Sequence, residues 1–439
     1  MIKPYTNYVS SDIKWVEAVP KDWKSVPFYT VASESKLSNK GMTEDNLLSL
    51  SYGRIKRKSI DTQGGLLPAS FETYQIVNDN DIIFRLTDLQ NDKRSLRSAQ
   101  CTERGIITSA YIAVTPSTIR SRYLHYLMRA YDETKVFYNL GAGMRQSLKY
   151  DELKRLPIIL PPELTQQAIE VFLDRETQRI DNLIEEKQSF IKILKEKRQA
   201  LISHVVTKGL NPDVEMQDSG IEWIGQVPKH WGVVQLKRLI DSIEQGWSPE
   251  CLATPAKNES WGVLKSGAVN GGVYCQNENK ELPETLSPRP EIEVKTGDLI
   301  MSRASGSREL IGSAAYVYET RERLMLSDKL FRLHCKEDVD AEFVAITLGS
   351  FPLRRQIELV IGGAEGLANN LSQANIKKLL LPKPSKSEQE AITSHIKSGS
   401  SKIEDLIIET NNSIALLKER KTSLISAAVT GKIDVREAV

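Results

Sequence analysis

Apolar side chains recur at close to heptad spacing along two long stretches of the chain. The stretch from 163 to about 208 contains neither proline nor glycine, and the stretch from 389 to 430 contains a single glycine, Gly399. Such spacing is typical of helices that pair as coiled coils, and we expect Gly399 to cost its helix roughly 1 kcal/mol relative to alanine. The predicted seam residues are Ile169, Leu173, Ile180, Leu183, Ile191, Leu194 and Leu201 in the first helix, and Ile392, Ile396, Ile403, Leu406, Ile414, Leu417 and Leu424 in the second.

Neither helix can bury its apolar stripe alone, because a single helix gains most of its stability by packing an amphipathic face. At ~1.5 Å per residue, the first helix would be about 65–70 Å long. Two matching helices in one chain most simply pack against each other, and the order of the segments makes the pair antiparallel. The alternative is that each helix packs only on the globular region that precedes it.

The two helices are copies of one sequence. Residues 166–207 align without a gap on residues 389–430 at a constant offset of 223, and residues 13–23 return as residues 221–231 at an offset of 208. The repeated parts form a fixed frame, and the stretches between them differ. We therefore expect a cyclic internal repeat with pseudo-twofold symmetry.

The regions between the repeats have a mixed pattern that predicts α+β folding. Residues 81–84 and 105–108 are short apolar runs typical of strands, and residues 123–137 place Leu124, Leu127, Met128 and Tyr131 on one face of a helix. In the second copy, residues 297–301 stand where residues 80–84 stood. The expected organisation is a head (1–22), a first module (23–160), a first spacer helix (161–208), a connector (209–230), a second module (231–383), a second spacer helix (384–432) and a tail (433–439).

Composition narrows the class of protein only modestly. Charged residues make up 26% and hydrophobic residues 40%, the net charge is +2, and no apolar run is long enough to span a membrane. The four cysteines and five histidines are scattered without metal-ligand spacing, which predicts free thiols and no metal site. No secretory signal is visible at the N-terminus, so we expect a cytoplasmic protein.

Sequence motifs of catalysis are missing. The chain has no GxxxxGK[ST], GxGxxG, HExxH or GxSxG pattern, nor the Asn/Asp-Pro-Pro-Tyr/Phe motif with which amino-methyltransferases hold the target amine. Residues 293–295 read Glu-Val-Lys, the E-x-K form of some metal-dependent nucleases, but residues 76–78 of the first module carry neither charge. We interpret 293–295 as a strand that leads into Gly297, and we expect the chain to have no catalytic site or cofactor of its own.

Polar side chains suited to reading DNA follow a predicted strand in each module, and a second group precedes each long helix. Arginine can bond guanine in two places, Asn and Gln can do the same for adenine, and lysine and serine suit phosphates. An ordinary solvated loop is the alternative interpretation. The candidates are Arg85, Thr87, Asp88, Gln90, Asn91, Lys93, Arg94, Arg97, Arg145, Gln146 and Ser147 in the first module, and Ser302, Arg303, Ser305, Arg308, Asn369 and Asn370 in the second.

Several motifs together resemble the specificity subunit of type I restriction-modification enzymes. They are the head Gly220-Ile221-Glu222-Trp223-Ile224-Gly225-x-Val227-Pro228-x-x-Trp231, the segment Leu153-Lys154-Arg155-Leu156-Pro157 leading into Pro161-Pro162 and Gln166-Gln167-x-Ile169, and the helix end Leu201-Ile202-Ser203-x-x-Val206-Thr207-x-Gly209. Residues 84–92 with 106–111 resemble one recurring type of recognition domain in that family. The resemblance spans essentially the whole chain. One departure is Lys149, which stands where a serine helix cap is usual, as at Ser372.

The resemblance implies a non-catalytic subunit with two target recognition domains, each reading one half of an asymmetric bipartite site in double-stranded DNA. An antiparallel helical spacer would separate the domains, set the half-site spacing and dock two modification subunits that methylate adenine with S-adenosylmethionine. Two motor-nuclease subunits, which use ATP and Mg²⁺, would join for restriction. Two other functions stay open: a self-contained restriction or methylation enzyme, and a protein-interaction scaffold with degenerate modules.

Overall fold

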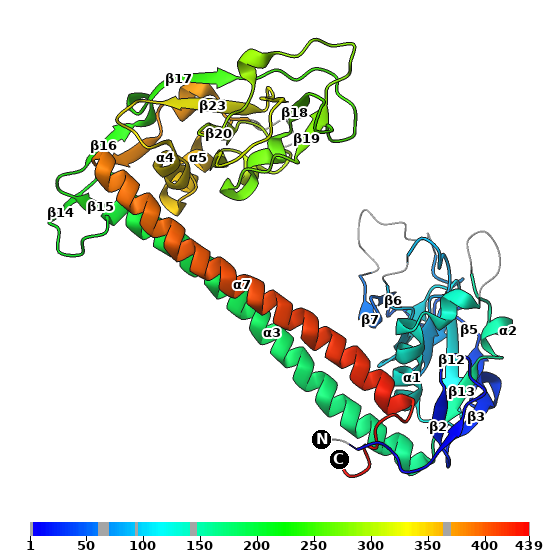
Figure 1. Ribbon diagram of the computed structural model, residues 1–439. Helices are drawn as coiled ribbons and strands as arrows, with labels where there is room; N and C mark the ends of the chain where they lie inside the picture. The colour runs from blue at the N-terminus through cyan, green and yellow to red at the C-terminus, as the bar shows by residue number, and fades with distance from the viewer. Residues whose placement is uncertain (1–2, 60–69, 93–94, 141–146, 363–369, 439) are drawn as a thin grey trace. The chain divides into compact units, whose positions relative to one another are not determined.

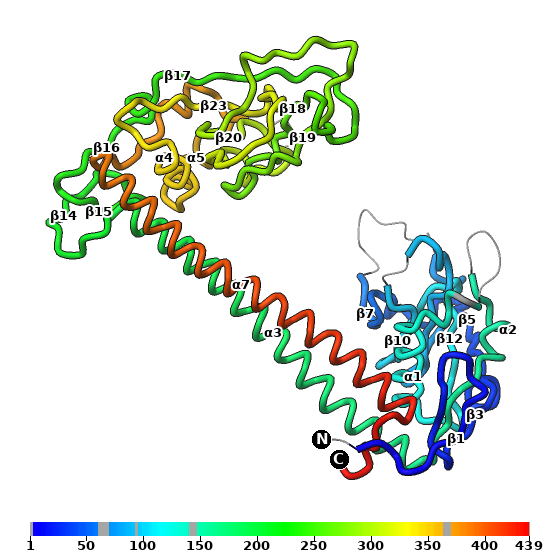
Figure 2. The backbone as a smooth tube through the Cα atoms, in the orientation of Figure 1, coloured from blue at the N-terminus to red at the C-terminus, as the bar shows by residue number. Residues whose placement is uncertain are grey.

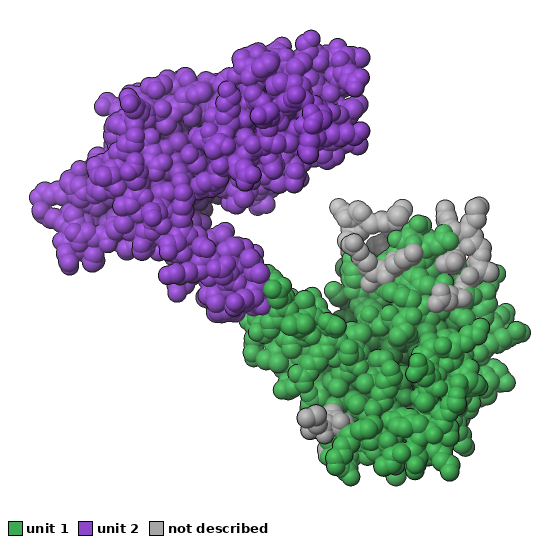
Figure 3. All heavy atoms as spheres, in the orientation of Figure 1, with its two compact units in different colours: residues 1–188, 411–439 green, residues 189–410 purple. Residues whose placement is uncertain are grey.

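The computed structural model describes residues 3–59, 70–92, 95–140, 147–362 and 370–438, which form two compact units. The first unit contains residues 1–188 and 411–439, and the second contains residues 189–410 (Figure 3). Each unit holds one α/β module and one portion of each long helix. The two units are described separately below.

The first module is built on a four-stranded antiparallel sheet with the order β10-β9-β12-β4. Strand β9 is buried along its whole length, as its uninterrupted apolar run predicts, and Ile83 pairs with Ala99 on one side and Ala113 on the other. The strands of this sheet are β4 (Ala32–Ser35), β9 (Ile82–Phe84), β10 (Ser98–Gln100) and β12 (Ile112–Pro116).

Smaller sheets complete the first unit: β1 with β2, β3 with β13, β6 with β7, and the three-stranded β11-β8-β5. Their bounds are β1 (Tyr8–Ser10), β2 (Ala18–Pro20), β3 (Lys24–Pro27), β5 (Leu37–Ser38), β6 (Leu48–Ser51), β7 (Arg54–Arg57), β8 (Gln75–Val77), β11 (Gly105–Ile107) and β13 (Pro157–Leu160).

Helix α1 (Ser121–Glu133) packs Leu124, Leu127, Met128 and Tyr131 into the core, as predicted. The helix ends four residues earlier than expected, because Lys135 has a left-handed backbone (φ +61°) and a 3-10 turn, Val136–Asn139, follows it. Helix α2 (Tyr150–Leu153) has no side-chain cap from Lys149, whereas Ser372 accepts a hydrogen bond from the Asn375 N–H at the start of α6. The departure from the family pattern is therefore real.

The second module repeats this architecture. Its main sheet has the order β17-β23-β20-β21, the counterpart of β4-β12-β9-β10. The module also has a three-stranded sheet, β19-β18-β22, whose strands alternate along the chain with those of the main sheet. The strands of the second unit are β14 (Met216–Asp218), β15 (Gln226–Pro228), β16 (Gly232–Gln235), β17 (Ile240–Gln245), β18 (Gly262–Leu264), β19 (Asn279–Glu281), β20 (Leu299–Ser302), β21 (Ala314–Tyr316), β22 (Leu324–Met325), β23 (Leu330–Cys335) and β24 (Leu380–Lys383). Its shorter helices are α4 (Ala341–Leu348), α5 (Phe351–Val360) and α6 (Gln373–Ile376).

The two predicted long helices are confirmed as α3 (Glu163–Lys208) and α7 (Lys386–Val429), which lie side by side in Figures 1 and 2. In the first unit Lys421 Nζ lies 2.7 Å from Asp181 Oδ2, and in the second unit Arg198 Nη1 lies 3.2 Å from Glu404 Oε2. In the second unit Val205 packs in one cluster with Ile392 and Ile396, and Leu194 packs in another with Ile403 and Ile407, so residues that come later in α3 meet residues that come earlier in α7 and the helices are antiparallel. The alternative, in which each helix packs only on its own module, is excluded.

Most predicted seam positions are buried, with one correction. Leu406 is 43% exposed, and the neighbouring Ile407 is 6% exposed and packs with Leu194 and Ile403. The heptad step of four residues from Ile403 reaches 407, which turns residue 406 toward solvent. Gly399 does not interrupt α7, and a Cβ at this position would lie 2.7 Å from a methyl carbon of Leu201.

The repeated heads fold identically and close the ends of the helices. Strands β1 and β2 pair as β14 and β15 do, each pair offset by 208 residues. Trp23 and Trp231 are buried and lie against Gly431 and Gly209 respectively. Both glycines have φ +74°, a left-handed conformation common directly after a helix.

Candidate nucleic-acid interface

The candidate loops leave the main sheets at equivalent points of the two modules. In the first module the Arg85 N–H donates to the Arg97 carbonyl at 2.8 Å, which closes the hairpin of β9 and β10. In the second, the Ser302 N–H donates to the Ser313 carbonyl, also at 2.8 Å, and closes the hairpin of β20 and β21. Both loops are therefore anchored on an inner strand of the module.

The second group of candidates is brought to the first by another backbone contact that recurs. The Leu148 N–H donates to the Leu86 carbonyl at 2.9 Å, and the Leu371 N–H donates to the Arg303 carbonyl at 2.8 Å. Asn370 also forms isolated β-bridges with Ala304 and with Gly362. The segments that sequence comparison singled out thus lie together in both modules, although about 60 to 70 residues separate them along the chain.

The candidates differ widely in exposure. In the first module the side chains of Gln90, Asn91 and Ser147 are exposed, and those of Arg85, Thr87 and Asp88 are half-buried. In the second, Arg308 and Asn370 are exposed, and Arg303 and Ser305 are half-buried. Lys93, Arg94, Arg145, Gln146 and Asn369 lie outside the described residues.

Arg97 corrects one prediction. Its side chain is 0% exposed, and its guanidinium donates to the carbonyls of Thr87 (3.2 Å) and Asp92 and to the hydroxyl of Tyr138 (3.2 Å). A guanidinium bound in this way cannot contact DNA without leaving the loop that it holds together. Ser302 is also 0% exposed, because it ends the buried strand β20, so it too is unsuited to direct contact.

Asp132 supports the Arg97 backbone from α1. Its Oδ2 accepts a hydrogen bond from the Arg97 N–H, while its Oδ1 is buried and has no hydrogen-bond partner. Burial raises the pKa of Asp132 to about 6, against the opposing effect of the Arg97 N–H. The loop of the first module therefore rests on a carboxyl group that titrates close to neutral pH.

A basic hairpin in the first module was missed by the sequence reasoning. The turn between β6 and β7 exposes Tyr52 (76%), and Arg54, Lys56 and Lys58 are exposed beyond it. Two of the hairpin arginines form ion pairs: Arg54 Nη2 lies 3.8 Å from Asp181 Oδ2, and Arg57 Nη2 lies 2.5 Å from Glu103 Oε2. The run Arg-Ile-Lys-Arg-Lys at 54–58 after the turn Ser-Tyr-Gly could have shown the hairpin, since basic residues alternate with one apolar position.

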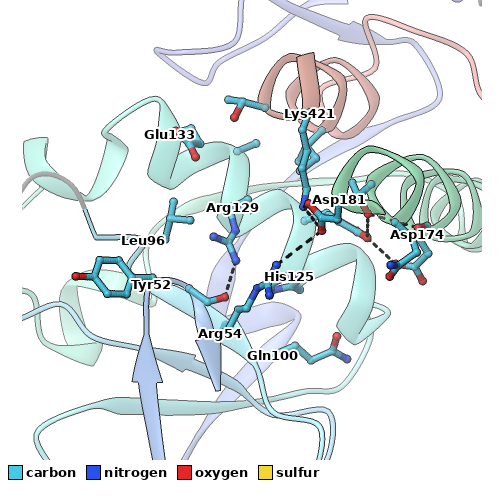
Figure 4. Close-up of a pocket in the computed structure, with 18 of the residues that line it drawn as sticks. Tyr52, Arg54, Leu96, Gln100, His125, Arg129, Glu133, Asp174, Asp181 and Lys421 are labelled. Carbon is cyan, nitrogen blue, oxygen red and sulfur yellow. Dashed lines mark hydrogen bonds and ion pairs between the residues drawn. The ribbon is translucent and has the colours of Figure 1, made fainter. Parts of the chain in front are cut away.

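A cleft of about 750 Å³ lies in the first unit between this hairpin, α1 and the helix pair (Figure 4). Its cationic side chains have partners within the cleft: Arg129 Nη2 donates to the Gly53 backbone carbonyl at 2.7 Å, and Lys421 Nζ donates to the Asp181 carboxylate. Burial, helped by Arg129 and Arg122, holds the pKa of His125 well below its usual value, so its ring is neutral at pH 7. These contacts join the hairpin and α1 to the helices.

The Glu293-Val294-Lys295 motif has a structural role. Glu293 forms one isolated bridge with Met325 rather than a strand, and its Oε1 accepts from the Arg323 N–H at 2.6 Å. The Lys295 N–H donates to Asp298 in the turn that follows. Among the described residues, no group of three or more metal-ligating side chains is found, and no helix is both long and apolar enough to cross a membrane.

The amino-acid sequence is similar to those of curated specificity subunits. It is 34% identical over 173 residues to the type I restriction enzyme EcoEI specificity subunit of Escherichia coli, a match that covers 39% of this chain and only 29% of that subunit. It is 25% identical over 373 residues to the type I restriction enzyme MjaVIII specificity subunit of Methanocaldococcus jannaschii, covering 82% of this chain and 81% of the relative. No family model matches the chain.

Solved structures show the same fold. A chain from structures of complex assembly and conformational transition of a type I R-M system aligns with a TM-score of 0.68 at 14% identity, covering 94% of this chain and 99% of the other. The HsdS subunit from Thermoanaerobacter tengcongensis aligns with a TM-score of 0.50 at 14% identity, covering 94% and 98%. Sequence and fold together thus confirm the resemblance seen in the motifs: this chain is a relative of the specificity subunits of type I restriction enzymes.

Proposed function

We propose that the chain is the non-catalytic DNA-specificity subunit of a type I restriction-modification complex. Each module would read one half of an asymmetric bipartite site in double-stranded DNA. The observation that carries this proposal is that loops of different sequence are held by the same backbone contacts in the two modules. The Leu148–Leu86 hydrogen bond of the first module has its equivalent in the Leu371–Arg303 bond of the second, while the side chains around the two bonds differ. Different side chains at equivalent places are what two different half-sites require.

The exposed side chains suit this task. Gln90 and Asn91 in the first module, and Asn370 in the second, can bond adenine in two places, and Arg308 can bond guanine. Lys56 and Lys58 on the β6–β7 hairpin suit phosphates, which position a protein on the duplex without reading its sequence. The remaining exposed or half-buried candidates would add to one of these two kinds of contact.

The helix pair would set the half-site spacing and dock two modification subunits. Both α3 and α7 are continuous, with 46 and 44 residues. Their surfaces expose large apolar side chains in the second unit, including Phe190, Ile193 and Ile408, and Leu416 is 66% exposed in the first. Phe190 and Ile193 are three residues apart and so share one face of α3, and exposed apolar side chains that adjoin in this way suit protein-protein contacts. S-adenosylmethionine would be bound by the modification subunits, and ATP and Mg²⁺ by two motor-nuclease subunits.

The decisive experiment maps methylated sites after reconstitution of the chain with a modification subunit. Replacing Gln90 and Asn91 together by alanine should relax recognition in one half-site, and replacing Arg308 and Asn370 should relax only the other. Changes in both halves from either variant would contradict modular reading. No enriched bipartite motif would favour the scaffold function, and methyl transfer by this chain alone would favour a self-contained enzyme.

The spacer role has its own test. Insertion of seven residues between 186 and 197, matched by seven in the facing part of α7, should lengthen the gap between the half-sites and leave both half-sites unchanged. The heptad length keeps the apolar seam in register. An unchanged gap would show that the helices do not set the spacing.

A further inference from the structure

Each module docks on one of the long helices through the same buried glutamine. In the first unit Gln166 Oε1 accepts from the Arg120 N–H at 3.0 Å, and its Nε2 donates to the Pro161 carbonyl at 2.9 Å. In the second unit Gln389 makes the same bonds to the Asp340 N–H and the Pro384 carbonyl, at 2.8 and 3.0 Å. Because these bonds are alike, Arg120 and Asp340 occupy equivalent positions in the two modules. Two residues further along each chain segment, Arg122 therefore corresponds to Glu342.

In the first unit the module supplies cations and the helix supplies carboxylates. Arg122 lies 2.7 Å from Asp174 Oδ1, the Tyr126 hydroxyl donates to the same oxygen at 2.5 Å, and the Arg122 guanidinium lies 5.0 Å from the centre of the Tyr126 ring. One helical turn earlier, Arg120 Nε lies 2.6 Å from Glu170 Oε2. Asp174 is seen on α3 in Figure 4.

In the second unit the same arrangement has the opposite polarity. At an offset of 223 residues, Lys397 replaces Asp174 and Thr393 replaces Glu170. Lys397 Nζ lies 2.6 Å from Glu342 Oε2 and 4.9 Å from the centre of the Tyr318 ring, and the Tyr318 hydroxyl donates to Glu342. Asp340 Oδ2 accepts from the Thr393 hydroxyl at 3.2 Å. Here the module supplies the carboxylates and the helix supplies the cation.

We infer that this reversed polarity makes each module selective for its own helix, so that the two modules cannot exchange places in the chain. The second module on α3 would bring Glu342 against Asp174 and Asp340 against Glu170. The first module on α7 would bring Arg122 against Lys397. Selectivity of this kind comes from repulsion in the wrong pairing as much as from attraction in the right one.

Burial makes the mismatch costly. The carboxylates Glu170 and Glu342 are 6% and 7% exposed, so each needs its partner in place. Fully exposed ion pairs contribute little, but a buried charge that loses its partner, or meets a like charge, destabilises strongly. The inference goes beyond the proposed function, because it concerns how the modules and helices of the chain assemble. It is valid whichever ligand the loops bind. If the loops do read DNA, the polarity also fixes the order of the two half-sites.

Charge reversal in the full-length chain tests the inference. The side chains of Arg122 and Asp174 are 39% and 46% exposed, so Arg122→Glu should speed amide hydrogen exchange of α1 about threefold, Arg122→Gln should speed it less, and adding Asp174→Lys to Arg122→Glu should restore the protection. The exposed pair Lys229–Glu215 is the matched control, and its reversal should leave exchange unchanged. If Asp174→Lys fails to rescue Arg122→Glu, or if Arg122→Gln is as harmful as Arg122→Glu, charge does not select the partner.

A transplanted module gives the second test and does not depend on the point variants. Residues 231–383 placed in the first position, in place of residues 23–160, should dock poorly on α3 and show rapid exchange in the transplanted copy of α4. Introducing Glu170→Thr and Asp174→Lys into α3 should then slow that exchange about tenfold. Equal exchange with and without the two helix substitutions would overturn the inference.

Discussion

The candidate loops of the two modules start from equivalent strands and are stabilised by different means. Arg97 and Ser313 are equivalent, because their carbonyls accept the N–H groups of Arg85 and Ser302. In the first module the Arg97 side chain binds carbonyls of the loop from inside, whereas in the second module Arg354 of α5 donates from outside the loop to the carbonyls of Ile311 (2.6 Å) and Glu309 (2.9 Å). One frame therefore accepts a loop anchored by an arginine of its own or by an arginine of a neighbouring helix, which frees the outer residues to vary.

The largest effect is expected from removing the internal anchor. Arg97→Met should destabilise the first unit by about 3–5 kcal/mol, because the carbonyls of the loop and the Tyr138 hydroxyl lose a buried donor. The matched variant Ser313→Ala should change stability by less than about 1 kcal/mol. Denaturant unfolding followed separately in each unit measures both changes. Equal losses would show that the residue at position 313 anchors its loop as Arg97 does.

The glutamines test how closely the two frames agree. Gln166 and Gln389 are 3% and 1% exposed, and each satisfies one N–H and one carbonyl. Replacing either by alanine should cost about 2 kcal/mol, since two buried backbone groups lose their partners. Thermal unfolding of the two variants should show similar losses. Clearly unequal losses would mean that one module relies on its ion pairs rather than on the glutamine.

The stability of the first unit should depend on pH through Asp132, which lies in the first module. Its pKa is raised from 3.8 to about 6, so the protonated carboxyl stabilises the folded unit relative to the ionised one. This contribution to the free energy of unfolding is fully present below about pH 4 and is lost as the pH rises through 6. Asparagine does not ionise, so Asp132→Asn avoids placing a charge in this buried position. The variant should therefore be more stable than the parent above pH 6, by on the order of 1–2 kcal/mol, and about equally stable below pH 4. Unfolding curves measured between pH 4 and 8 would reveal the trend. A difference that is independent of pH would show that Asp132 keeps an ordinary pKa in the folded chain.

The two long helices and the heads could be predicted from the sequence, because they appear there as a repeated segment and as a regular spacing of apolar residues. The 223-residue repeat predicted both long helices, and the apolar run at 81–84 predicted β9. Pairing of the helices followed from the need to bury their stripes. These inferences depend on local pattern and on the solvent, and neither requires knowledge of distant contacts.

Other features depend on contacts that no local pattern carries. Arg97 was assigned to DNA because arginine can bond guanine in two places, and its burial depends on Asp132 and Tyr138, which lie 35 and 41 residues away. Leu406 and Ile407 are both apolar, so spacing alone left the seam ambiguous by one residue. The reversed charges at 174 and 397 are visible in the sequence, but their partners at 122 and 342 can be matched only once the helices α1 and α4 are placed.

The smallest effect concerns the one glycine within the long helices. Gly399 corresponds to Glu176 in α3, and a methyl group at 399 would meet the flexible end of the half-buried Leu201 side chain. Alanine favours a helix by roughly 1 kcal/mol over glycine, and a terminal methyl group of Leu201 can rotate away at lower cost. Gly399→Ala should therefore stabilise the second unit by about 0.5 kcal/mol, similar to Ser401→Ala at an exposed position of the same helix. If thermal unfolding instead shows a loss with Gly399→Ala, and adding Leu201→Ala removes the penalty of the methyl group, the close approach of the helices at this point is what requires glycine.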